Sequence, residues 1–182
     1  MAIIALAMSR LFLGPFEEAA LANGAVIKNI AAGESWRILT GSFLHHNIQH
    51  WLINCVLLIF IVPLIAFYSM KAAVLCFFVG TLLSQVCYIL FGIIGFHDHD
   101  LLVGFSGGIY ALLAYLLLDT VLARQRYPHG FFILVTAFIL LIFVGTELLK
   151  ANASGISHAS GFFGGALIFV CNFLIRRHRV GE

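Results

Sequence analysis

A serine and a histidine in apolar surroundings are the two residues of this sequence whose chemistry most needs an explanation. Ser106 stands in Gly104-Phe105-Ser106-Gly107 at the head of an apolar run, and His158 stands near the start of a later run. Polar groups are expensive inside a membrane and are usually functional there. Because a neutral histidine that accepts its proton turns a serine hydroxyl into a nucleophile, the pair predicts nucleophilic catalysis.

The composition is that of a membrane protein. Hydrophobic residues make up 62% of the 182 residues and charged residues 10%, against about half and about a quarter in an average soluble domain. Successive apolar runs broken by short polar turns leave no room for a separate soluble domain. We therefore expect one membrane domain over residues 1–182, an all-α polytopic bundle.

Hydropathy and turn signals predict six transmembrane helices with short connections. The first is too short to span, because residues 1–14 rise only about 21 Å at about 1.5 Å per residue; we expect a first span whose beginning is missing or thinned. The connection over residues 15–46 is long and mixed in character, and short interfacial helices are expected there. The six predicted helices cover residues 1–14, 47–68, 72–96, 104–123, 131–149 and 156–175.

The positions of lysine and arginine predict the orientation of the bundle. Basic residues concentrate in alternate turns and in the C-terminal tail, which marks the cytoplasmic side. Both termini are then cytoplasmic, and we expect a multi-pass protein of the bacterial inner membrane. The net charge of +2 reflects this topology and predicts no nucleic-acid partner. The residues of the basic side are Lys71, Arg124, Arg126, Arg176, Arg177 and Arg179.

Helical rise places four polar residues at one depth. Ser106 and His158 each precede a basic turn by about 27 Å of rise, and His50 and Asn54 stand at a similar distance from the basic turn that follows their own helix. In a hydrocarbon core of about 30 Å, all four lie just beneath the outer face. Residues far apart in the sequence are thus predicted to converge on one layer.

This layer contains the groups that acyl transfer needs besides a nucleophile and a base. Donors must face the negative charge that develops on the carbonyl oxygen. The backbone N–H of Ser106 stands at a helix start, where such groups have no intrahelical partner. His50 and Asn54 are four residues apart and share a helix face, so the three are predicted to form an oxyanion hole.

No acid is predicted behind the histidine. Asp119 lies about 20 Å from Ser106 along the same helix, so we expect a Ser-His dyad rather than a triad. Tyr110 lies on the same helical side as Ser106 and offers an aromatic face to orient His158.

Small residues are predicted to let the two helices approach closely. Gly107 follows the serine directly, and Gly161 with Gly165 makes a G-x-x-x-G pattern on the helix of His158. Such patterns allow close helix contact in membranes.

These features together resemble the rhomboid family of intramembrane serine proteases over nearly the whole chain, from about residue 14 to residue 175. The residues that carry the resemblance are Trp36-Arg37 in the first loop, His45 and His50 followed by Asn54, the Gly-Phe-Ser-Gly motif with Tyr110, and His158 with Gly161 and Gly165.

The resemblance implies roles for single residues. Ser106 would be the nucleophile and His158 the base, and His50, Asn54 and the Ser106 N–H would bind the oxyanion. Tyr110 would support His158, and Trp36-Arg37 would anchor the first loop in the interface. No cofactor or metal is implied.

The resemblance also implies partners, namely transmembrane segments of membrane-protein substrates within the lipid bilayer. The sequence departs from the common family pattern at residues 61–66, at Ser157 and at Phe162-Phe163, which affects helix packing and the choice of substrate. A short chain would also suit the rhombosortase branch of the family.

Three other interpretations compete. A G-x-S-x-G elbow of a soluble hydrolase lacks the alternating strands and helices that it requires. A metal site at His46 and His50 lacks the glutamate of H-E-x-x-H, because Asn47 takes its place; a further cluster, His97 to Asp100, resembles a solvated loop. The third is an inactive relative that binds transmembrane helices without cutting them. The presence of both Ser106 and His158 argues against it.

Overall fold

The structure is a computed structural model, and it describes residues 15–95, 101–149 and 154–180. This part of the chain is mostly helical, as predicted. The long helices are α5 (Ile48–Ile93), α6 (Ser106–Leu122), α7 (Phe131–Leu149) and α8 (Ser154–Val180). The short ones are α2 (Phe16–Asn23), α3 (Ile27–Ala31), α4 (Arg37–Gly41) and a 3₁₀ turn, η2 (Arg124–Arg126).

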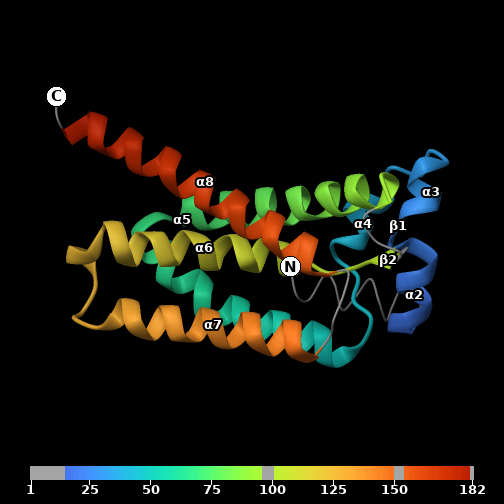
Figure 1. Cartoon of the computed structure of the whole chain (residues 1–182), viewed down its shortest axis with the longest axis horizontal. Helices are drawn as coiled ribbons and strands as arrows, with labels where there is room; N and C mark the ends of the chain where they lie inside the picture. Colours follow the sequence, from blue (N-terminus) through green and yellow to red (C-terminus); the bar gives the residue numbers. More distant parts are fainter. Residues whose placement is uncertain (1–14, 96–100, 150–153, 181–182) are drawn as a thin grey trace.

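Helix α5 contains two apolar segments that run in opposite directions (Figure 1). The break is at Ser69, whose φ of −163° and ψ of 98° are not helical. The Ser69 hydroxyl accepts a hydrogen bond from the Ala72 N–H at 3.2 Å, so it caps the second half as Asn47 caps the first. The boundary predicted between residues 68 and 72 is therefore found.

Helix α6 runs through the middle of the bundle, between the halves of α5 and beside α8 (Figure 1). Its residues Ile109, Leu112 and Leu113 are fully buried. By contrast, outward side chains such as Phe67 and Phe163 are 83% and 72% exposed. An outer surface this apolar is suited to lipid rather than to water.

Two of the described helices are long and apolar enough to cross a membrane, α5 and the Gly155–Arg177 part of α8. Shorter apolar helices cover Ser106–Leu122 and Phe131–Ile142. The count of six spans stays a prediction, and the first predicted helix, residues 1–14, lies outside the described residues.

The first loop and the segment before α6 meet at one end of the bundle (Figure 1). Strand β1 (Ala25–Val26) pairs antiparallel with β2 (Leu101–Leu102). Next to this pair, the Gly104 N–H donates to the Gly41 carbonyl at 2.8 Å. The short helices expected over residues 15–46 are present, and they hold the chain that leads into α6.

A polar cluster closes the opposite end of α6. The buried Asp119 accepts from Arg126 Nη1 at 3.1 Å and from the Tyr127 hydroxyl at 2.5 Å. Burial, together with this carboxylate, raises the pKa of Tyr127. The Tyr68 hydroxyl donates to the Arg126 carbonyl at 2.6 Å, so the cluster ties the α6–α7 turn to the break in α5.

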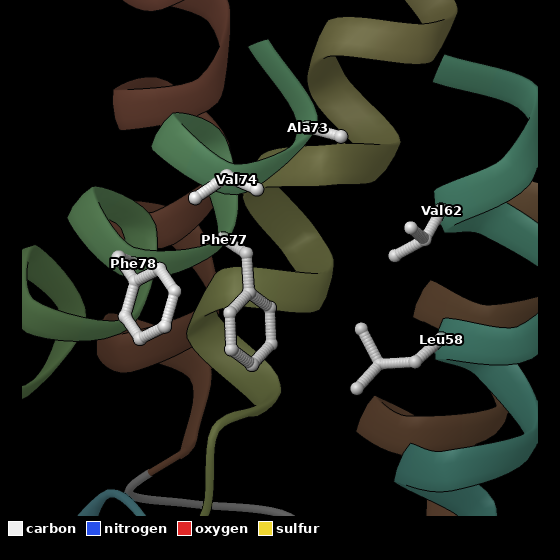
Figure 2. A pocket seen from close by; sticks show the side chains of 6 residues that line it. All are labelled: Leu58, Val62, Ala73, Val74, Phe77 and Phe78. Carbon is white, nitrogen blue, oxygen red and sulfur yellow. The ribbon is translucent and has the colours of Figure 1, made fainter. Parts of the chain in front are cut away.

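A cavity of about 170 Å³ opens between the two halves of α5 (Figure 2). Its walls are apolar side chains throughout, and no predicted site residue contributes to them. The lining residues are Leu58, Val62, Ala73, Val74, Phe77 and Phe78.

Candidate active site

The side chains of Ser106 and His158 meet. Ser106 Oγ lies 3.0 Å from His158 Nε2, although the two residues are 52 positions apart in the chain. Ser106 is the first residue of α6 and is half-buried, whereas His158, in the second turn of α8, is buried. The serine hydroxyl can thus be reached from outside, and the imidazole is shielded.

The backbone before Ser106 is bent by a glycine. Gly104 has a φ of +107°, a conformation that L side chains rarely adopt, so the helix begins at Ser106 rather than at residue 104 as predicted. The Gly104 carbonyl accepts a hydrogen bond from Gln85 Nε2 at 3.3 Å, and the Gly104 N–H donates to the Gly41 carbonyl. Gln85, fully buried in α5, was missed in the sequence, although an amide in an apolar run is itself a signal.

Helices α6 and α8 touch backbone to backbone beside the dyad. A Cβ at Gly161 would overlap the carbonyl of Gly107, and a Cβ at Gly165 would overlap the carbonyl of Ala111. On the other side of α6, a Cβ at Gly107 would overlap Ser84 of α5. The predicted small-residue contact is what allows a short serine side chain to reach the histidine.

The ring of Tyr110 lies flat against the imidazole. The ring centroids of Tyr110 and His158 are 4.1 Å apart, with an interplanar angle of 12°. Both side chains are buried, so the stacked tyrosine limits the orientations open to the histidine. Asp119, the buried carboxylate of α6, is hydrogen-bonded to Arg126 and Tyr127 at the far end of that helix.

The predicted oxyanion residues lie on the first turns of α5. The imidazole of His50 lies against Gly104, where an added Cβ would be 3.1 Å from its Cε1 and 3.4 Å from its Nε2. Asn54 is buried, and its Nδ2 lies 3.1 Å from Nε2 of His45. The contact with His45 was not foreseen, because His45 lies in a loop where no helical spacing applies.

Trp36 and Arg37 hold the first loop together and do not touch the dyad. The Arg37 guanidinium lies 4.9 Å from the centre of the Trp36 ring. It also binds the Glu34 carboxylate and the Gly24 carbonyl, the latter at 3.3 Å. The hydrogen bond from Arg37 lowers the pKa of Glu34.

The histidines considered as metal ligands are arranged as stacked rings. The rings of His46 and His50 are 6.1 Å apart at an interplanar angle of 22°. Within the described ranges, no group of three His, Cys, Asp or Glu side chains could hold a metal ion. The cluster from His97 to Asp100 lies outside the described residues.

Comparison with known proteins identifies the family. The rhomboid domain matches residues 32–174, a range that includes every site residue predicted from the sequence. No curated protein matches the chain closely enough to count as a relative. The match is to the family as a whole, so the rhombosortase branch stays a prediction. The chain belongs to the rhomboid family, whose members are integral membrane proteins and generally serine proteases that act on membrane-protein substrates.

Proposed function

We propose that this protein is an active intramembrane serine endopeptidase, which hydrolyses peptide bonds in or beside transmembrane segments with a Ser106–His158 dyad. The observation that carries the proposal is the 3.0 Å separation of Ser106 Oγ and His158 Nε2. This is a hydrogen-bond distance across which a proton can pass. Polar residues inside a membrane bundle usually mark a functional site, and here the pair lies at the start of α6, where a backbone N–H can face the same substrate carbonyl.

The first step forms an acyl-enzyme. The Ser106 hydroxyl proton passes to His158 Nε2 while Oγ attacks the carbonyl carbon of the scissile bond. The tetrahedral intermediate collapses as the protonated histidine gives that proton to the leaving amine. In the second step a water attacks the ester and His158 accepts the water proton. The histidine then gives this proton to Oγ, which leaves as the hydroxyl, and the acid product is released.

The negative charge of each tetrahedral intermediate needs donors. In the proposal these are the Ser106 N–H at the start of α6, the His50 imidazole and the Asn54 amide. Backbone N–H groups at a helix start have no intrahelical partner and favour an anion. The position of His50 against Gly104, two residues before Ser106, supports this arrangement.

The substrate must expose a carbonyl to these groups. A transmembrane helix hides its carbonyls in internal hydrogen bonds, so we expect the cleaved segment to unwind, and segments with glycine or proline near the cut to be preferred. We further propose that residues 1–182 form one domain of six spans in the bacterial inner membrane. Both termini would be cytoplasmic and the dyad would lie near the outer face.

A fluorophosphonate probe tests the nucleophile directly. The wild-type protein in detergent should be labelled, and Ser106→Ala should abolish labelling because the attacked oxygen is gone. Ser160→Ala is the matched control, since the Ser160 hydroxyl donates to the Ile156 carbonyl at 2.7 Å and lies on α8. Labelling that survives in Ser106→Ala would reject the proposed nucleophile.

Cleavage of a tagged transmembrane substrate tests the whole reaction. His158→Ala should lower turnover by several orders of magnitude, whereas removal of the exposed His129 should leave it unchanged. If cleavage stops with a chelator and the probe does not label, a metal-dependent activity replaces the proposal. A wild-type protein that binds the substrate but neither cuts it nor labels is an inactive relative.

A further inference from the structure

We infer that His45 is a positioning residue, which holds the Asn54 amide in the orientation that an oxyanion donor needs. The inference rests on the proposed function, because it assigns a purpose to a contact with one of the proposed donors. His45 has no exposed surface, and its Nε2 lies 3.1 Å from Asn54 Nδ2. Helical spacing does not account for this contact, since His45 precedes α5 and Asn54 lies in its second turn.

The surroundings of His45 fix its ring. The ring meets His50 edge to face at a centroid distance of 5.0 Å and Phe105 at 4.8 Å. Phe105 precedes the nucleophile directly, and an added Cβ at Gly104 would lie 3.6 Å from Cδ2 of His45. The imidazole therefore lies between the first turn of α5 and the segment that leads into Ser106.

A neutral His45 ring at this position determines which way the Asn54 amide is oriented. Burial, reinforced by the neighbouring His50, lowers the pKa of His45, so the ring is uncharged and one nitrogen can accept a hydrogen bond. An Asn54 amide that donates one N–H to His45 Nε2 has a second N–H left over. That second N–H is the one that would face the developing oxyanion.

The contact also excludes the wrong orientation. A rotated amide would present its oxygen, which repels an oxyanion, at the place where a donor is needed. An asparagine without a partner can adopt either orientation, since its oxygen and nitrogen ends are nearly equal in size. With its ring proton on Nδ1, His45 accepts from Asn54 Nδ2 at Nε2 and selects the orientation that leaves a donor for the reaction.

A double-mutant cycle on the intact protein, with cleavage of a tagged transmembrane substrate in detergent, tests the inference. His45→Ala should lower kcat by about one to two orders of magnitude, somewhat less than removal of a whole oxyanion donor. KM should change little, because the oxyanion exists only during the reaction. In the Asn54→Ala background the same change should cost less than about threefold, since its target is absent.

Two further variants separate positioning from folding. His45→Gln keeps an acceptor at similar reach and should recover most of the lost turnover. Leu44→Ala removes a fully buried side chain of the same loop, which packs on Ala19, Ala20 and Val103. The effect of Leu44→Ala on kcat should be the same with and without Asn54. This holds even if Leu44→Ala destabilises the protein more than His45→Ala does.

The outcomes are distinct. Additive effects of His45→Ala and Asn54→Ala in an active enzyme would overturn the positioning role and leave the proposed protease standing. Turnover in His45→Gln no better than in His45→Ala, with both folded, would overturn it as well. A wild-type protein that neither labels with fluorophosphonate nor cleaves would reject the proposed function itself, and the inference with it.

Discussion

The glycine contact between α6 and α8 gives the sharpest quantitative prediction. Gly161→Ala adds one methyl group where the carbonyl of Gly107 now lies. Real Cβ atoms essentially never approach within 3.0 Å of such an atom, so the two helices must separate by on the order of 1 Å. The clash involves backbone on both sides and cannot be relieved by rotating a side chain.

The same movement acts on the dyad, which these two helices carry. The Ser106–His158 distance of 3.0 Å would grow to about 4 Å, beyond the range of a hydrogen bond. A misplacement of about 1 Å costs about 100-fold in rate. Overpacking should also lower the free energy of unfolding by about 1–3 kcal/mol, a loss that leaves most molecules folded.

Gly164→Ala is the matched control on the same helix. A Cβ at Gly164 would meet only the tip of the Leu83 side chain, at 2.8 Å, and that flexible group can turn aside. We expect its turnover to stay within about threefold of wild type. Steady-state cleavage and thermal unfolding in detergent should be measured for both variants. Wild-type turnover in a folded Gly161→Ala protein would refute the reasoning.

Three more predictions follow from contacts at other places. Tyr110→Ala should lower turnover about tenfold, the value of one stacked ring pair, while Tyr110→Phe should keep most of it; equal losses in the two would argue against stacking. Asp119→Ala should lower the free energy of unfolding by about 2–4 kcal/mol with turnover per folded molecule unchanged, as measured by denaturation and cleavage. Because the Arg37 hydrogen bond lowers the pKa of Glu34, their contact stabilises the fold above the ordinary glutamate pKa of about 4.3 and is lost as the pH falls through the lowered value. Glu34→Gln should therefore reduce the pH dependence of the melting temperature in that acidic range, and an unchanged dependence would contradict this.

Much of the site could be predicted because it depends on helical geometry. Rise per residue placed Ser106 and His158 at one depth, and in the structure their side chains are in contact. Spacing along α6 put Tyr110 on the side of the serine, where the structure has it stacked on the histidine. Glycine spacing likewise anticipated the contact of α8 with α6.

Contacts made by loops could not be predicted in this way. The interactions of His45 with Asn54 and of Gln85 with the Gly104 carbonyl depend on how irregular backbone folds over the helix ends. The same holds for the start of α6, which the positive φ of Gly104 moves to Ser106. At the other end of the bundle, Asp119 was judged by its distance from the serine, and its partners in the α6–α7 turn were not foreseen.

The order of the helices in the chain has a consequence for synthesis. Ser106 lies on α6, but the imidazole beside it lies on α8, and the two are 52 residues apart. While the ribosome delivers the chain into the membrane, the serine is inserted well before the histidine. In the proposed mechanism, a nascent chain that ends before α8 has a serine hydroxyl without its base, so it would not cleave neighbouring membrane proteins until the later helix docks.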